Sequence, residues 1–111
     1  MRILFAAPNR DLLQCYQALL SEDGDETTTA FDGAQALNLI RTGAYDLVIL
    51  DQNLPLVPYR QLLPELQAAG MRSILLLDSG LEEGAAPDAS IAYPFLPAEL
   101  QTLISEVTSH E

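Results

Sequence analysis

The chain has 111 residues, a length typical of one domain, and 49% of them are hydrophobic, which is enough for a buried core and excludes a disordered acidic tail. Its net charge of −11, with basic residues that are all arginines, argues against direct binding of nucleic acid. No apolar run approaches the roughly 20 residues that a membrane span needs. With no signal peptide and one cysteine, Cys15, we expect a cytoplasmic domain that makes no membrane contact.

Apolar runs alternate with helical patterns along the chain. The runs predict strands over 2–7, 26–31, 46–50, 72–78 and 90–93. Apolar residues at helical spacing predict four helices: over 9–22, over 32–43, one that contains Leu62, Leu63 and Leu66 and ends at Gly70, and one over 96–108. In the third of these helices Pro64 is expected in the first turn, because an interior proline would kink it. The stretch 79–90 contains Gly, Pro and acidic residues without an apolar stripe, so no full helix is expected there.

Alternating strands and helices predict an α/β fold, a parallel sheet with helices on both faces. The run 47–50 has no polar alternation, which is typical of a strand covered on both faces. Reaction and ligand sites of such sheets lie at the carboxyl ends of the strands. Asp51 follows the third strand and Asp78 ends the fourth, so we expect both to point into one crevice.

Three motifs resemble the receiver domain of bacterial two-component response regulators, the CheY-like domain. They are "YDLVILDQNLP" at 45–55, "DGAQAL" at 32–37 and "YPFLPAEL" at 93–100. The resemblance covers nearly all of 1–111 as one receiver-like domain. It implies a flavodoxin-like α/β/α fold with strand order 2-1-3-4-5 and a fifth helix ending near 108. The segment 79–90 is about two helical turns short of the family's, so helix four is expected to be shortened or missing.

By the resemblance, Asp51 is the phosphoacceptor, but its neighbours in the family pattern are altered. Ala7 and Pro8 stand where the family has two Mg²⁺-binding acids, and neither offers an oxygen side chain. Asp78 replaces a Thr or Ser, and Tyr93 replaces the lysine. Phosphoryl transfer depends on metal and cation charge. We therefore expect no metal, no cofactor and no enzymatic activity, with Asp51 hydrogen-bonded to loop amides. Tyr93 either fills the lysine's space or is a signalling aromatic that changes rotamer.

The resulting hypothesis is an atypical receiver domain that transmits signals by phosphorylation-independent protein interaction or dimerisation. Its output would be a domain outside this chain, often DNA-binding, and the regulated process would be transcription. The expected interface lies on strand five and helix five and comprises Ile91, Tyr93, Leu96 and Leu100. Two alternatives stay open. One is a working receiver phosphorylated at Asp51 in a phosphorelay, and the other is a small-molecule sensor that uses the altered crevice.

Overall fold

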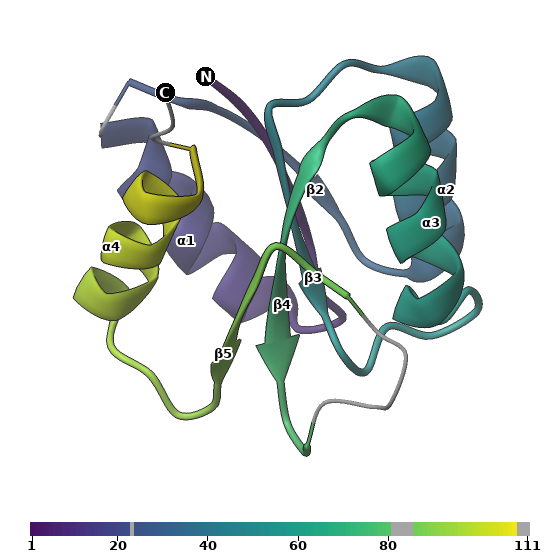
Figure 1. Ribbon diagram of the computed structural model, residues 1–111. Coiled ribbons are helices and arrows are strands. Elements are labelled where there is room, and N and C mark those ends of the chain that lie inside the picture. Colours follow the sequence, from purple (N-terminus) through teal and green to yellow (C-terminus); the bar gives the residue numbers. More distant parts are fainter. Residues whose placement is uncertain (23, 81–85, 109–111) are drawn as a thin grey trace.

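The computed structural model describes residues 1–22, 24–80 and 86–108 of the chain (Figure 1). Strands and helices alternate up to the fourth strand, as the sequence predicts. The strands are β1 (Arg2–Ala6), β2 (Glu26–Ala30), β3 (Leu47–Asp51), β4 (Arg72–Leu77) and β5 (Ala89–Ala92). The helices are α1 (Arg10–Glu22), α2 (Gly33–Thr42), α3 (Tyr59–Ala69) and α4 (Pro97–Thr108). The helix labelled α4 is the expected fifth helix.

The five strands form one parallel sheet in the order β2-β1-β3-β4-β5, which confirms the flavodoxin-like fold. Helices α1 and α4 cover one face and α2 and α3 cover the other (Figure 1). Every residue of β3 is buried, because this central strand lies between two strands and two helical layers. Across the described residues, no helix combines the length and the apolar character needed to cross a membrane.

Strand side chains alternate between the two layers and divide the core in two. Leu4, Val48 and Leu75 pack toward α2 and α3. Ile3 and Ile49, from the same strands, pack toward α1 and α4 instead. The uninterrupted apolar runs of the sequence therefore reflect two buried faces.

The start of α2 is joined closely to the loop between β3 and α3. Asp32 caps the helix by accepting a hydrogen bond from the backbone N–H of Gln35, with N and O 2.7 Å apart. The next residue, Gly33, donates its N–H to the carbonyl of Pro55 at 2.9 Å. A Cβ at Gly33 would lie 1.8 Å from the carbonyl oxygen of Val57, so only glycine fits. This contact fixes the loop that follows Asp51.

The expectation for Pro64 is wrong. The helix begins at Tyr59, so Pro64 lies in its interior and not in its first turn. Its ring is on the solvent side, where it removes a backbone hydrogen bond without disturbing the core. Tyr59, Leu62, Leu63 and Leu66 bury the opposite face against the sheet. Their packing sets the start of the helix one turn earlier than the proline suggests.

No full helix lies between β4 and β5 in the part of this segment that the structure describes, 78–80 and 86–88; residues 81–85 lie outside it. Side-chain hydrogen bonds hold the described parts of this segment in place. Gln52 donates from its side-chain amide to the Gly80 carbonyl at 3.1 Å, and Gln67 of α3 donates to the Ala86 carbonyl at 3.2 Å. Asp88 accepts from the N–H of Ser73, whose hydroxyl accepts from the N–H of Asp88.

Candidate functional site

Asp51 ends β3 at the carboxyl edge of the sheet and is only 5% exposed. Both of its carboxylate oxygens accept hydrogen bonds. The backbone N–H of Asn53 donates to Oδ1 at 2.8 Å, so the expected bond to a loop amide is present. The hydroxyl of Tyr93 donates to Oδ2 at 2.7 Å, a bond that the sequence did not reveal. The apolar strand thus ends on an acid whose charge is stabilised by two donors.

Tyr93 reaches Asp51 from the end of β5, across β4. Its ring stacks on Phe95 with centroids 5.1 Å apart, and Phe95 lies 6.0 Å from the ring of Tyr16 on α1. Burial raises the pKa of the Tyr93 hydroxyl, and the hydrogen bond to Asp51 and its negative charge raise that pKa further. The hydroxyl is therefore a neutral donor and does not supply the positive charge of a lysine. The Tyr93–Pro94 peptide bond is cis.

Asp78 lies beyond the end of β4, and its side chain is exposed. Asn53 links it to Asp51, because the side-chain amide of Asn53 donates to Oδ2 of Asp78 at 3.1 Å and its backbone N–H donates to Asp51. The neighbouring Gln52 accepts the N–H of Asp78 at 2.8 Å and that of Ser79 at 2.9 Å. Sequence reasoning missed both amides, although their positions directly after Asp51 were a signal.

The remaining altered positions lie at the end of β1. Ala7 is fully buried and donates its N–H to the Ala30 carbonyl at 3.0 Å, whereas Pro8 is exposed. Neither side chain has an oxygen to offer a hard cation such as Mg²⁺. Among the described residues, no three His, Cys, Asp or Glu side chains gather in a group that could hold a metal ion. Because the nearby acids are Asp51, with both oxygens engaged, and the exposed Asp78, these residues do not fit a magnesium site.

The four residues expected at the interface differ in solvent exposure. Leu96 is 66% exposed, while Ile91 and Tyr93 are half-buried and pack against the α1 and α4 side of the core. Leu100, which was expected at the interface, cannot contact a partner there, because its side chain is fully buried. Leu100 and Ile104 form the stripe with which α4 packs on the sheet.

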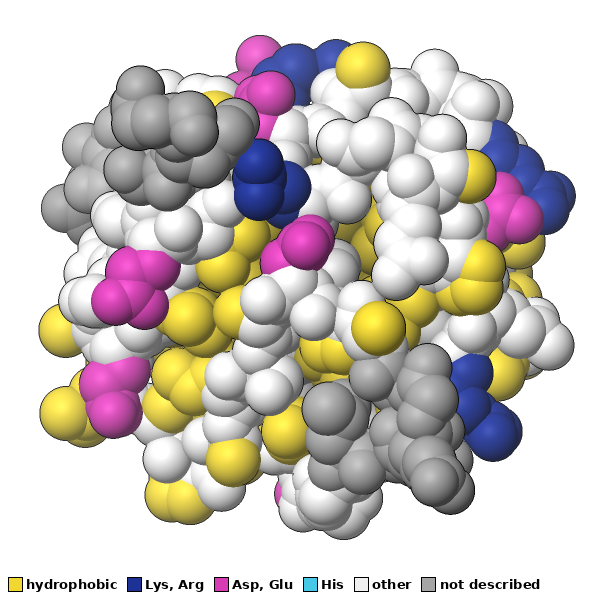
Figure 2. Space-filling model, viewed as in Figure 1, with side chains coloured by type: hydrophobic (Ala, Val, Ile, Leu, Met, Phe, Trp, Pro, Cys, Tyr) yellow, Lys and Arg dark blue, Asp and Glu magenta, His cyan; other side chains and the backbone are white. Residues whose placement is uncertain are grey.

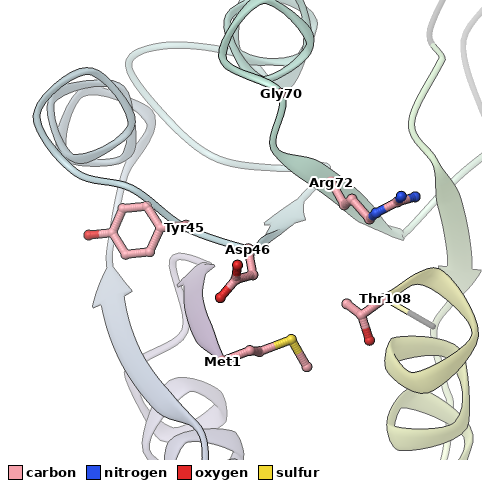
Figure 3. Close-up of a pocket in the computed structure, with 6 residues that line it drawn as sticks. All are labelled: Met1, Tyr45, Asp46, Gly70, Arg72 and Thr108. Carbon is pink, nitrogen blue, oxygen red and sulfur yellow. The ribbon is translucent and has the colours of Figure 1, made fainter. Parts of the chain in front are cut away.

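A cavity of about 390 Å³ lies at the other end of the sheet, where β1 and β4 begin (Figure 3). Its lining residues are Met1, Tyr45, Asp46, Gly70, Arg72 and Thr108. Figure 3 shows the Asp46 carboxylate directed toward the start of β1, where Met1 lies, and the Arg72 side chain extending away from them. None of the altered crevice positions lines this cavity, so it is separate from Asp51.

Comparison with known proteins agrees with this geometry, although no family model matches the chain. The receiver domain of the sensor histidine kinase PA1611 from Pseudomonas aeruginosa PAO1 superposes with a TM-score of 0.86 and 26% identity, covering 96% of both chains. The transcriptional regulatory protein DltR of Streptococcus agalactiae is 36% identical over 110 residues. This chain is a CheY-like response regulator receiver domain.

Two of the similar structures contain magnesium, and the match to DltR covers only part of that protein. The receiver PA1611 was solved with a magnesium ion in its active-site cleft. The response regulator TrrA of Thermotoga maritima was solved with Mg²⁺ and BeF; it superposes on 96% of this chain and 97% of its own with a TM-score of 0.84 and 26% identity. The match to DltR covers 90% of this receiver but only 48% of DltR, so the chain spans about half of that relative.

Proposed function

We propose that this receiver domain transmits a signal through phosphorylation-independent protein interaction, chiefly self-association through β5 and α4. The observation that supports this most is the hydrogen bond of 2.7 Å from Tyr93 to Asp51. A neutral hydroxyl occupies one oxygen of the carboxylate, at the position where the family resemblance places a lysine.

The charges around Asp51 also support the proposal. A phosphoryl group on Asp51 would add negative charge in a crevice that already contains the Asp78 carboxylate, which is linked to Asp51 through Asn53. Receivers offset such charge with a metal ion and a cation. Here Ala7 and Pro8 cannot bind a metal, and the chain has no lysine. Attachment of a phosphoryl group is therefore expected to be unfavourable.

A titration with beryllofluoride and Mg²⁺ tests this part of the proposal. We expect no saturable shift of the amide NMR signals of Asp51, Asn53 or Tyr93. The receiver TrrA, solved with Mg²⁺ and BeF, serves as positive control in the same buffer. Binding to this chain that disappears in Asp51→Asn would instead support the alternative, a working receiver; the burial of Asp51 at the end of β3 favours that alternative most.

Sedimentation of the unphosphorylated protein tests the interaction part. Leu96 is 66% exposed in the loop before α4, and Leu56, in the β3–α3 loop, is 77% exposed. We expect Leu96→Glu to weaken association and the matched control Leu56→Glu to leave it unchanged. Equal effects of the two substitutions would place the interface elsewhere.

The output is proposed from the relatives. DltR, and TctD of Salmonella typhimurium, which is 31% identical over 77 residues, are named transcriptional regulatory proteins. We infer that this receiver controls a transcriptional output in a segment beyond the chain. A reporter assay comparing the wild-type regulator with Asp51→Asn would show equal regulation if phosphorylation is not required.

A further inference from the structure

Strand β5 forms one edge of the sheet and pairs only with β4 (Figure 1). The N–H of Tyr93 donates to the Leu77 carbonyl at 2.9 Å, so the backbone N–H of Tyr93 points toward β4. Backbone groups of successive strand residues point in alternate directions. The backbone N–H and C=O groups of Ile91 and Ala89 therefore point toward β4. Those of Ser90 and Ala92 point outward, away from the sheet.

The two edges of the sheet differ in their side-chain contacts. On β2 the backbone groups of Thr27 and Thr29 point outward, and the carbonyl of Thr27 accepts a hydrogen bond of 3.2 Å from the side chain of Gln17 on α1. No described side chain makes a comparable bond to Ser90 or Ala92, whose side chains are both exposed. Unpaired edge strands readily accept another strand.

The charge at this edge favours a second copy of the same chain. Two copies with a net charge of −11 each repel one another wherever their acids meet. The four residues of β5, "ASIA", carry no charge. Asp88, which directly precedes them, is exposed, and its carboxylate accepts a hydrogen bond from the backbone N–H of Ser73 on β4, away from the outer side of β5. Figure 2 shows hydrophobic side chains distributed over this side of the molecule. The β5 strand is thus a place where two acidic copies can meet without bringing negative charges of the strand face to face.

We propose that two copies pair their β5 strands antiparallel about a twofold axis and extend the sheet across the dimer. This inference rests on the proposed self-association and gives it a register. Outward-facing Ser90 pairs with Ala92 of the second copy, and such a pair exchanges both N–H···O bonds. The symmetry repeats the pair on the other side of Ile91, which lies opposite its own copy. Twofold pairing of identical surfaces is the commonest form of oligomer.

Packing on both faces is compatible with this register. Ile91 lies on the α4 side of the sheet and is half-buried, so the two Ile91 side chains would close over each other. Leu103 and Val107 of α4 are partly buried and lie nearby on the same layer. On the opposite face the side chains of β5 are Ser90 and Ala92, which are small and leave room for the neighbouring strand.

Proline substitutions test the pairing. Ala92→Pro removes an N–H that points outward, and the hydrogen bonds between β5 and β4 are all kept. We expect Ala92→Pro to raise the dimer dissociation constant by roughly tenfold or more, since each copy loses a hydrogen bond at the seam. The matched control is Thr29→Pro, which removes an outward N–H from the β2 edge and is expected to leave the constant unchanged. Circular dichroism and thermal melting report whether each variant folds.

Hydrogen exchange of the wild-type protein supplies a measurement that needs no mutation. The amides of Ser90 and Ala92 are expected to become protected as concentration rises, whereas that of Thr29 is not. Association that persists in Ala92→Pro, with Ser90 and Ala92 exchanging freely, would overturn the strand pairing and leave self-association standing. A wild-type monomer at high micromolar concentration would overturn both.

Discussion

The bond between Tyr93 and Asp51 can be tested by removing one oxygen atom. The change Tyr93→Phe keeps the ring that stacks on Phe95 and deletes the hydroxyl that donates to Asp51 at 2.7 Å. A hydrogen bond to a charged group contributes about 1.5–3 kcal/mol. Because Tyr93 is only half-buried and Asp51 keeps the Asn53 amide, we expect a loss of about 1–2 kcal/mol. At about 4 °C per kcal/mol for a domain of this size, Tm should fall by roughly 4–8 °C.

A double-mutant cycle with Asp51→Asn isolates this bond, with urea unfolding as the assay. The control is Tyr16→Phe, which removes a hydroxyl for which no hydrogen bond is seen among the described residues, and its cost should stay below about 0.5 kcal/mol. If Tyr93→Phe costs the same with Asp51 and with Asn at that position, the hydroxyl does not act through the carboxylate and our account of the site fails.

The stability difference between the wild type and Tyr93→Phe should depend on pH. The pKa of Tyr93 is raised above its ordinary value of 10.0, first by burial and then by Asp51. Above that ordinary value the unfolded chain releases the phenol proton while the folded chain retains it, so stability falls as pH rises, by up to about 1.4 kcal/mol per pH unit. The stability advantage of the wild type over Tyr93→Phe should be full below pH 10 and shrink above it. A stability difference between the two proteins that stays unchanged up to pH 11 would contradict this.

Two further predictions concern the start of α2. Gly33→Ala places a Cβ 1.8 Å from the Val57 carbonyl and should cost at least about 1–3 kcal/mol in urea unfolding, whereas the control Gly80→Ala, with open space around it, should be close to neutral. Asp32→Ala removes the cap bond to the N–H of Gln35 and should cost about 1 kcal/mol, with the amide of Gln35 exchanging faster; an unchanged exchange rate would show that the cap is not formed.

The sheet could be predicted because its strands carry their own signal. The run 47–50 is apolar at every position, as burial on both faces requires, and the structure places Leu47–Asp51 at the centre of the sheet. The alternation of elements then restricts the topology to a parallel sheet with helical layers. Strand and helix ends shifted by a residue or two, because hydrogen bonding and not hydropathy decides where an element stops.

The errors arose where tertiary packing decides between local alternatives. Pro64 suggested a late start for α3, but four buried side chains on the opposite face outweigh one missing backbone bond. Leu96 and Leu100 are equally apolar in sequence, yet only the loop residue Leu96 is exposed once α4 packs. The link from Tyr93 to Asp51 joins residues 42 positions apart and has no local signature.

Under the proposed function, the signal depends on the concentration of the protein and not on phosphorylation of Asp51, and the contacts around Asp51 are compatible with this. In a phosphorylated receiver, a new charge on the acid would have to alter β5, whereas here Tyr93 already ties β5 to Asp51. Gln52 fixes the chain beyond β4 through the N–H groups of Asp78 and Ser79. These bonds form on folding and need no phosphoryl group. The geometry of the β5 edge is therefore set before any partner arrives, and we infer that the amount of protein, through mass action on association, is what changes the signal.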